Sequence, residues 1–204
     1  MTSILGPGRF WSIFKDVIDA RHPDPEVLNL EDISISLGNI CRFGGHLRDF
    51  YSVADHSRFV ARILVARNVD QKTVLAGLVH DVVEVITGDI ISPMKPIFGE
   101  GLKQVDDLWT PVVEKFFGLE SGATSVPEVK AADLAAYYVE NQILRGWPGQ
   151  HVQHLNDAGG PTEAMEKYGG LWRTPLLPYD SGMAWFAEMC SRGFISAGLT
   201  GVFK

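Results

Sequence analysis

Along most of the chain, apolar residues recur every three to four positions, which is the spacing typical of helices. The stretch from Val53 to Ala66 has this spacing and predicts an amphipathic helix. The next stretch, Gln71–Thr87, is apolar on nearly every side, which indicates one continuous helix buried at the centre of the fold. Further helices are expected from Asn29 to about Gly38, a residue that weakens the helix end, and over residues 101–117, 127–145 and 181–192.

The segments between these helices are marked by glycine and proline. Residues 1–30 are expected to be irregular, with room for one short extended or amphipathic piece, and residues 146–162 to form a long exposed loop. Strand signals are scarce, so the sequence predicts an all-α fold. A length of 204 residues suits a single domain. In this domain residues 29–145 form the core and residues 146–204 a C-terminal loop and helix.

Two adjacent polar residues, His80 and Asp81, lie in the middle of the most apolar predicted helix. Burying an unpaired carboxylate there costs on the order of several kcal/mol. The cost is much smaller if the imidazole and the carboxylate bind one cation, and these ligand types suit Mn²⁺, Co²⁺, Fe²⁺, Zn²⁺ or Ni²⁺. Glu84 follows on the same helix face, where it could hydrogen-bond a water at the site, and Asp89 lies just past the helix end. By itself, however, a His-Asp pair is more typical of a hydrogen-bonded core.

Two further helices carry polar residues of the same kind. His56 lies among apolar neighbours in SVADHSRFVA, and Asp133 lies on an apolar helix in VKAADLAAYYVENQIL. Each alone is better explained as a hydrogen-bonded core residue. Together, three buried helices offer metal-binding side chains in the order His, His-Asp, Asp, which predicts one divalent metal site between helices.

In this order of residues the sequence resembles the HD-domain superfamily of metal-dependent phosphohydrolases, whose defining pattern is H…HD…D. The matching stretches are NICRFGGH, FYSVADHS, LVHDVVEVITGDIISPMK and VKAADLAAY. The resemblance covers about residues 29–144, and it is strongest to the bacterial 5′-deoxynucleotidase branch and to the HD-type deoxynucleoside triphosphate triphosphohydrolases of phages. The resemblance implies a helical HD-domain bundle that hydrolyses phosphoester bonds of (deoxy)nucleotides. The product would be phosphate from a monophosphate, or triphosphate from a triphosphate such as dATP.

The resemblance also implies roles for individual residues. Glu84 and Asp89 match an acidic pair that orients or activates the attacking water and assists the leaving oxygen. Arg42 resembles the arginine that holds the scissile phosphate, and Lys95 is similar to a lysine that faces the phosphates. Phe43 stands where the branch carries a tryptophan that senses the 2′-position of the sugar, so we expect it to bear on sugar preference. The implied ligands of a single divalent ion (Mn, Co, Fe, Zn, Ni or Mg) are His56, His80, Asp81 and Asp133.

Three other features bear on the site. His46 follows the double glycine, and it could reach the phosphate or be an exposed loop residue. Tyr137 could stack on a base or sugar, although packing in the core is the simpler interpretation for Tyr137 and for its neighbour Tyr138. The HxxH pair of His151 and His154 lies in a glycine- and proline-rich stretch without acidic neighbours, so we interpret both as loop residues.

Net charge and the lack of targeting signals limit the binding partners and the cellular location that we expect. A net charge of −7 disfavours binding to long nucleic acids, whereas local cations can still hold a small nucleotide. The sequence has neither a signal peptide nor an apolar stretch long enough for a membrane span, which predicts a cytoplasmic protein. Trp172 and apolar positions of the last helix could support a homodimer or a higher homo-oligomer.

Two alternatives stay open. A degenerate HD domain could act as a nucleotide sensor or interaction module without catalysis, although such a module need not keep Glu84 and Asp89. Hydrolysis of alarmones such as ppGpp fits less well, because those enzymes have HDxxED where Val85 stands here. No GYP motif is present, which disfavours a cyclic-dinucleotide phosphodiesterase.

Overall fold

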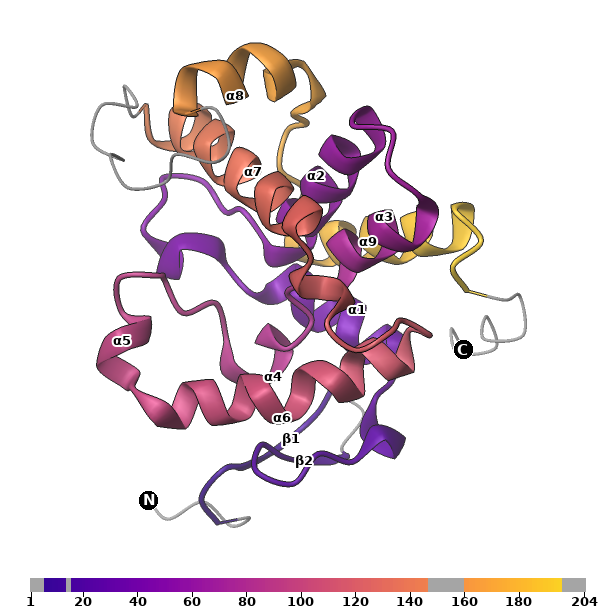
Figure 1. Cartoon of the computed structure of the whole chain (residues 1–204). Coiled ribbons are helices and arrows are strands. Elements are labelled where there is room, and N and C mark those ends of the chain that lie inside the picture. Colours follow the sequence, from indigo (N-terminus) through magenta and orange to yellow (C-terminus); the bar gives the residue numbers. More distant parts are fainter. Residues whose placement is uncertain (1–5, 14–15, 147–159, 196–204) are drawn as a thin grey trace.

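The computed structural model describes residues 6–13, 16–146 and 160–195 (Figure 1). This part of the chain is mostly helical, as the sequence predicts. The expectation of an all-α fold is incomplete at the N-terminus, where strands β1 (Arg9–Trp11) and β2 (Val17–Asp19) form a small antiparallel hairpin in which Phe10 pairs with Ile18. The hairpin lies below the helices in the view of Figure 1, at the end of the molecule away from α8.

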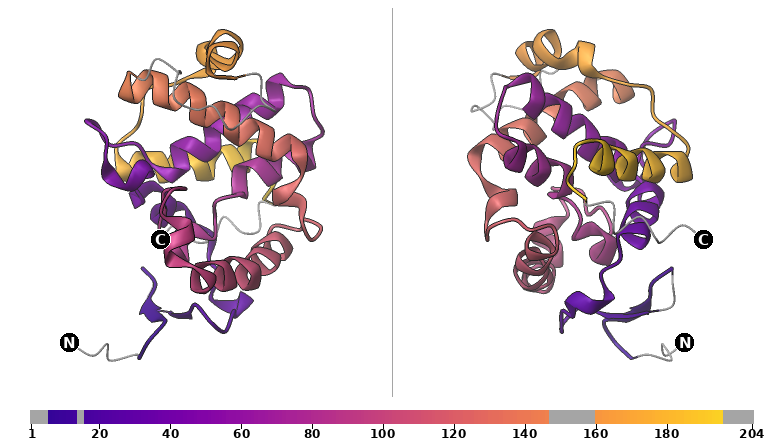
Figure 2. Two further views of the ribbon diagram at one scale, coloured as in Figure 1. Left: turned by 60° about the vertical axis from the view of Figure 1, so that its left-hand side comes forward. Right: turned by 90° about the vertical axis from the view of Figure 1, so that its right-hand side faces the viewer.

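Helix α2 (Val53–Ala66) lies at the centre of the fold and has the bounds that the apolar spacing predicts. Its first turn is capped by Ser52, whose Oγ accepts from the Asp55 N–H at 3.0 Å. Helices α1, α3, α7 and α9 all pack against α2 (Figures 1 and 2). A polar side chain on the inner side of α2 is therefore surrounded by protein, and His56 is fully buried there.

The predicted continuous helix over residues 71–87 is wrong: the structure divides it at His80. Helix α3 (Gln71–Val79) ends there, and the short helix α4 (Glu84–Thr87) begins four residues later. Between them the backbone N–H groups of Val82 and Glu84 donate to the carbonyl oxygens three residues earlier, at 3.0 and 2.9 Å. Such tight turns have about three residues each, so side chains three apart lie over one another. Asp81 and Glu84 are brought to the same side in this way.

Because the helix is broken, two carbonyl groups lack their usual backbone donors and accept hydrogen bonds from side chains instead. The Leu78 carbonyl accepts from the Trp185 indole Nε1–H at 2.9 Å, while Val82, its usual helical partner, donates to Val79. The Gly77 carbonyl accepts from Nδ1 of His80 at 2.8 Å. Because buried carbonyl groups need donors, these two bonds stabilise the broken geometry on which the site depends.

Helices α1 (Leu30–Asn39) and α9 (Pro178–Ser191) pack against each other through glycines. A Cβ atom on Gly38 would lie 2.3 Å from the Pro178 carbonyl oxygen, and one on Gly182 would lie 2.3 Å from the Ser34 carbonyl oxygen. Helix α1 ends one residue after Gly38, close to the predicted end, and the close approach of the two backbones gives a further reason for glycine at this position. Helix α9 also begins three residues before the predicted position, with Pro178 in its first turn.

The remaining helices complete the fold. Helix α7 (Pro127–Arg145) has the predicted bounds, and α6 (Glu100–Phe116) is shifted by one residue from the prediction. Helices α5 (Lys95–Phe98) and α8 (Gly160–Tyr168) were not expected from the sequence, and α8 begins inside the predicted 146–162 loop. Short 3-10 turns cover Pro25–Val27 (η1), Arg42–Gly45 (η2), Ala123–Ser125 (η3) and Gly169–Leu171 (η5).

Trp172, the residue considered for a dimer contact, packs within the chain. Its ring lies 5.2 Å from that of Tyr51 and meets Phe59 edge-on at 5.4 Å. The apolar residues Trp185, Phe186 and Met189 of α9 are also buried in the core. Within the described residues, no helix combines the length and the hydrophobicity that crossing a bilayer requires.

Candidate metal centre and pocket

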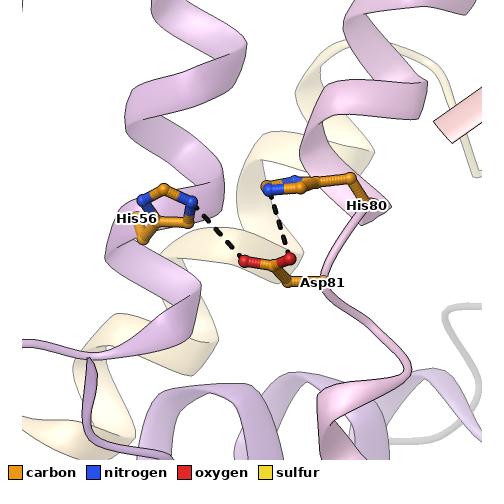
Figure 3. Close-up of side chains that lie close together, drawn as sticks. All are labelled: His56, His80 and Asp81. Atoms are coloured by element: carbon orange, nitrogen blue, oxygen red, sulfur yellow. Dashed lines mark ion pairs between the residues drawn. The ribbon is translucent and has the colours of Figure 1, made fainter. Parts of the chain in front are cut away.

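Three elements bring the predicted ligands together. His56 projects from α2, and His80 and Asp81 lie at the break after α3 (Figure 3). One ligand atom from each of the three lies within 4.8 Å of the others. The Asp81 carboxylate lies between the two rings, with one oxygen 3.5 Å from Nε2 of His56 and the other 3.2 Å from Nε2 of His80. The side chains point toward one another, as a group that holds one ion must.

Asp133 reaches the same point from α7. Its Oδ1 lies 3.1 Å from Nε2 of His56 and 3.8 Å from Nε2 of His80. A divalent ion about 2.1 Å from each ligand atom would separate neighbouring ligand atoms by about 3.0 Å in octahedral and 3.4 Å in tetrahedral geometry. Two of the observed separations, 3.1 and 3.2 Å, are in this range, and the other two, 3.5 and 3.8 Å, are slightly longer. His56, His80 and Asp81 are therefore close enough in space to hold one ion, and Asp133 lies within 3.8 Å of both imidazoles.

The hydrogen bonds of the two imidazoles show that both rings fit a metal. Nδ1 of His56 lies 2.6 Å from Glu140 Oε1, and Nδ1 of His80 lies 2.8 Å from the Gly77 carbonyl oxygen. Both partners are acceptors, so each Nδ1 carries a proton and donates it. Each Nε2 is left for the site, and both Nε2 atoms are buried without a hydrogen-bond partner among the described residues. Metal-binding histidines usually have this second bond to the protein.

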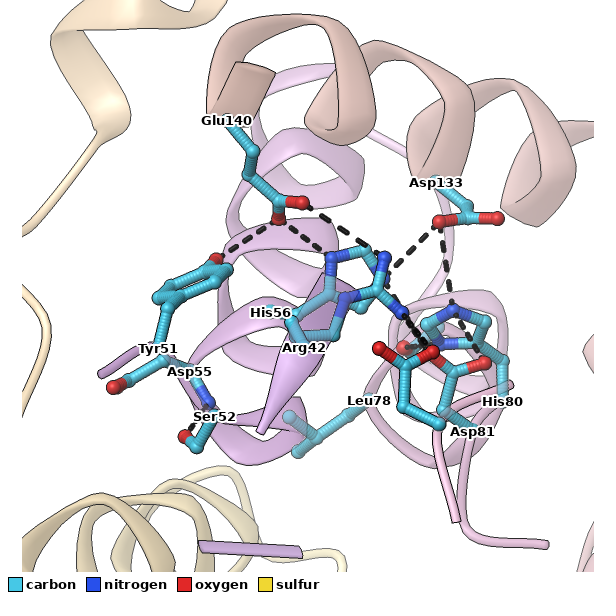
Figure 4. Close-up of polar contacts among 12 residues, drawn as sticks. Arg42, Tyr51, Ser52, Asp55, His56, Leu78, His80, Asp81, Asp133 and Glu140 are labelled. Carbon is cyan, nitrogen blue, oxygen red and sulfur yellow. Dashed lines mark hydrogen bonds and ion pairs between the residues drawn. The ribbon is translucent and has the colours of Figure 1, made fainter. Parts of the chain in front are cut away.

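Glu140 is a site residue that the sequence reasoning missed. It lies on α7, is fully buried, and accepts from the Tyr51 hydroxyl at 2.9 Å as well as from His56 (Figure 4). Burial and the Glu140 charge raise the pKa of Tyr51 well above its usual value, so the phenol keeps the proton that it donates. A signal was present in the sequence, because Glu140 follows Asp133 by seven residues and so lies two turns along the same face of α7.

Electrostatic effects in the cluster favour positive charge. Burial and Arg42 lower the pKa of His56, but the carboxylates of Glu140 and Asp133 outweigh them and raise it to about 10. Burial also lowers the pKa of His80, and Asp81 and Asp133 reverse that effect and raise it. A cation at this position is therefore compatible with the surrounding carboxylates, and a metal ion would have to displace protons from the imidazoles.

Arg42 lies beside the candidate metal ligands, where the resemblance places the phosphate-binding arginine. Its Nη1 is 3.3 Å from Asp81 and 3.7 Å from Asp89, and its Nη2 is 3.8 Å from Glu140. Asp89 also accepts from the backbone N–H of Phe43 at 2.8 Å. Phe43 has a φ of +58°, a conformation that costs a non-glycine residue about 1–2 kcal/mol. Asp89 thus stabilises a strained turn that places Arg42 and Phe43 at the site.

Glu84 faces the same space from the first residue of α4. Burial raises its pKa well above the usual value, and the nearby charge of Asp81 adds to this effect. Its Oε2 is buried and has no hydrogen-bond partner among the described residues. A carboxylate with a raised pKa beside a metal site is suited to accept a proton from water.

A pocket of about 490 Å³ opens onto the candidate centre. Asp81, Glu84, Asp89 and Asp133 contribute carboxylates to its wall, and the predicted residues His46, Lys95 and Tyr137 line it as well. Pockets of this size hold small organic ligands. The structure thus brings all the sequence-predicted site residues to one cavity, or to the cluster of imidazoles beside it.

The other side of this pocket is aromatic and basic. The ring centroids of Phe43 and Tyr137 are 6.1 Å apart, and the guanidinium group of Arg145 lies 5.4 Å from the Phe43 ring. Arg145 was missed from the sequence because it is the last residue of α7, where a basic side chain usually interacts with the helix end. Tyr138 is buried in the core, as expected, whereas Tyr137 reaches the pocket. The HxxH pair of His151 and His154 lies outside the described residues.

Comparison with known proteins finds relatives of similar length. An uncharacterized protein of Rhodobacter capsulatus is 33% identical over 136 residues, a match that covers 64% of this chain and 69% of that protein. The uncharacterized protein YfdR of Escherichia coli K12 is 36% identical over 126 residues, which cover 62% of this chain and 65% of YfdR. No protein-family model matches the chain. Neither relative's name states an activity, so the chemistry of the site has to indicate the function.

Proposed function

We propose that this chain, which belongs to the family of the uncharacterized Rhodobacter capsulatus protein, is a metal-dependent nucleotide phosphohydrolase with the helical bundle of the HD-domain superfamily. One observation carries the proposal. Two imidazoles turn buried Nε2 atoms toward the carboxylates of Asp133 and Asp81, at 3.1 Å for His56 and 3.2 Å for His80, beside a pocket with basic residues on its wall. The arrangement combines a cation site with groups that bind an anion, which is what metal-assisted phosphoester hydrolysis requires.

In this proposal His56, His80, Asp81 and Asp133 hold one divalent ion. When bound, such an ion lowers the pKa of water and polarises a phosphoryl oxygen. The two nitrogen and two oxygen donors suit Mn²⁺, Co²⁺, Fe²⁺, Zn²⁺ or Ni²⁺ better than Mg²⁺, which prefers oxygen. The hydrogen bonds that Nδ1 donates in His56 and His80 keep both rings in the orientation in which Nε2 can bind the metal.

Glu84 and Asp89 have different tasks in this proposal. Glu84 accepts the proton of the attacking water, because its buried carboxylate has a raised pKa and an unpartnered oxygen beside Asp81. Asp89 faces the leaving oxygen and also holds the Arg42–Phe43 turn through the Phe43 N–H. Catalysis by a positioned base of this kind contributes about 10²- to 10⁴-fold to the rate.

The substrate is held by the pocket wall. The Arg42 guanidinium group can bind a phosphate through two parallel N–H groups, and the ammonium group of Lys95 acts as a point charge. His46 is exposed at the same wall and can donate to a phosphate oxygen. Phe43 and Tyr137 offer aromatic faces for a base or a sugar. These contacts fit a mononucleotide or a nucleoside triphosphate.

A nucleotide panel tests the proposed function. The purified chain is incubated with dAMP, dATP, AMP and ATP in the presence of Mn²⁺, Co²⁺, Zn²⁺ or Mg²⁺, and the products are separated by ion-exchange chromatography. Release of phosphate from a monophosphate identifies a 5′-nucleotidase, and release of triphosphate identifies a triphosphohydrolase. Nucleotides that stay intact with every metal would contradict a phosphohydrolase, and nucleotide binding without turnover would then indicate a sensor.

A further inference from the structure

Glu140 connects the two halves of the candidate site. Its Oε1 is 2.6 Å from Nδ1 of His56 and 2.9 Å from the Tyr51 hydroxyl, and its Oε2 is 3.8 Å from Nη2 of Arg42 (Figure 4). One carboxylate thus contacts a proposed metal ligand with one oxygen and faces the proposed phosphate-binding arginine with the other. Glu140 does not line the pocket itself, so it can act only through these partners.

We propose that Glu140 is a positioning residue that holds His56 in its metal-binding tautomer and places Arg42 beside the ion, with Tyr51 fixing the carboxylate in turn. This inference rests on the metal site of the proposed function but not on the identity of the substrate.

The contacts of Glu140 differ from those of a buried glutamate that only stabilises the fold. Glu114, which is also almost fully buried, accepts from the backbone N–H groups of Gly122 and Thr124 at 2.7 and 2.9 Å, and so closes the turn after α6. The contacts of Glu140 go to the side chains of His56, Tyr51 and Arg42 instead. Glu140 thus orients side chains of the candidate site, whereas Glu114 binds two backbone N–H groups and the Thr124 hydroxyl of a turn away from that site.

The role requires a carboxylate and not just a polar group of that shape. All three partners present hydrogen to Glu140, because the Tyr51 phenol, Nδ1 of His56 and the Arg42 guanidinium group are donors here. A glutamine would offer one acceptor oxygen and would turn its NH₂ group toward Arg42 or toward the shared position of Tyr51 and His56. With NH₂ toward Tyr51 and His56, the Nδ1–H of His56 loses the acceptor that fixes its tautomer. With NH₂ toward Arg42, His56 keeps only a neutral acceptor, and Arg42 loses the carboxylate that faces it.

The test compares metal binding in matched variants. Wild type, Glu140→Gln and Glu114→Gln are stripped of metal, and binding of Mn²⁺, Co²⁺ and Zn²⁺ is measured by titration calorimetry together with the thermal midpoint of each stripped protein. Loss of an outer partner of a metal-binding histidine typically weakens affinity by about 10- to 100-fold, so we expect this loss in Glu140→Gln. Glu114→Gln should lower the thermal midpoint and leave metal affinity at the wild-type value.

The outcomes distinguish this inference from the proposed function. A wild-type protein that binds none of the three metals would overturn the metal site itself. Wild-type binding that Glu140→Gln retains in full, or that Glu114→Gln loses to the same extent, would overturn the role of Glu140 alone. If Glu140→Gln does not fold, Tyr51→Phe provides the test, because it removes only the donor that fixes the carboxylate. That variant should bind metal several-fold more weakly, and unchanged affinity would contradict the inference.

Discussion

His56 and His80 each use one ring nitrogen for the protein and turn the other toward the candidate site. The acceptors differ, a carboxylate for His56 and a backbone carbonyl for His80, but both fix the proton on Nδ1. An imidazole that donates its Nδ1–H to a carboxylate is a more basic metal ligand than one that donates to a backbone carbonyl. Nearby carboxylates outweigh the effect of burial and raise the pKa of both rings, that of His56 to about 10.

Metal binding should therefore release protons. With a pKa of about 10, His56 still holds its second proton at pH 7, and a metal ion must displace that proton from Nε2. Lowering the pH makes this displacement harder, so affinity should rise as the pH increases from 6 to 9. Calorimetric titration at pH 7 in two buffers with different ionisation enthalpies checks the release. A binding enthalpy that is the same in both buffers would contradict it.

Glu84→Gln should separate catalysis from metal binding. Glu84 is assigned as the proton acceptor and not as a ligand, so the variant should bind metal like the wild type. Its kcat should fall by about 10²- to 10⁴-fold, the usual contribution of a positioned general base. Metal content and kcat are measured on the same preparation. Turnover near the wild-type rate would show that another group accepts the proton.

Individual residues were predictable from the sequence where they broke a pattern. His56, His80, Asp81 and Asp133 are polar residues on apolar helices, and this contrast identified them. Glu140 is also polar on an apolar face, but no repeated spacing connected it with His56, which is 84 residues away and meets it only in the folded chain. Arg145 resembled an ordinary helix-ending residue, and its position over the Phe43 ring depends on the path of a distant loop.

At the scale of elements, the break between α3 and α4 is the feature that the sequence could not show. Every position from Val74 to Val83 is compatible with one buried helix, and periodicity does not register a change to tighter turns. The change depends on donors from elsewhere, above all the Trp185 indole on α9, 107 residues away from Leu78. Tertiary contacts thus break the helix after α3, although the intrinsic preferences of the residues there favour a continuous helix.

Trp185→Phe should weaken both the fold and the site. The substitution keeps an aromatic ring but leaves the Leu78 carbonyl without its indole donor, which costs about 1–3 kcal/mol when the group is buried. Trp109→Phe is the matched control, because the Trp109 indole donates to the Ala20 carbonyl at 3.0 Å, outside the candidate site. Urea unfolding should show a loss of stability in both variants, and metal titration a loss of affinity in Trp185→Phe only. Equal affinities in the two variants would count against a link between the break and the site.

The contact of α1 with α9 gives a second prediction about elements. Gly38→Ala places a methyl group against the backbone of α9, and such overpacking costs about 1–3 kcal/mol. Gly101→Ala is the control, because its Cβ meets nothing within 4 Å in α6, and alanine favours a helix by about 1 kcal/mol over glycine. Thermal unfolding should therefore move in opposite directions for the two variants. A Gly38→Ala protein as stable as wild type would mean that α9 can shift away from α1.

For the whole molecule, the predicted order of the main helices is confirmed, and the segments added by the structure are short. The β1–β2 hairpin, α5 and α8 lie where glycine and proline made the pattern irregular, and pieces of three to nine residues carry too few periods to be recognised. The central position of α2 follows from its apolar residues, and it explains why candidate ligands from α2, from the break after α3 and from α7 meet. The cluster thus combines His56 of α2 and Asp133 of α7 with His80 and Asp81 of the break that follows α3.

The charge of the whole chain also agrees with the proposed function. An excess of seven acidic charges disfavours polymers of phosphate, whereas the basic residues that line the pocket stand next to the candidate metal centre. Arg42, Lys95 and Arg145 are such residues. The local field can therefore hold a small anion in a chain that is acidic as a whole.

The central claim is that one divalent ion, held by His56, His80, Asp81 and Asp133, enables the chain to hydrolyse a nucleotide. The most direct test follows hydrolysis of dAMP and dATP while Mn²⁺ is titrated into metal-stripped wild type and Asp81→Ala. We predict that wild-type turnover increases up to one ion per chain, and that Asp81→Ala neither binds the ion tightly nor turns over either nucleotide. Full turnover by Asp81→Ala, or hydrolysis by the stripped wild type that Mn²⁺ does not change, would contradict the claim.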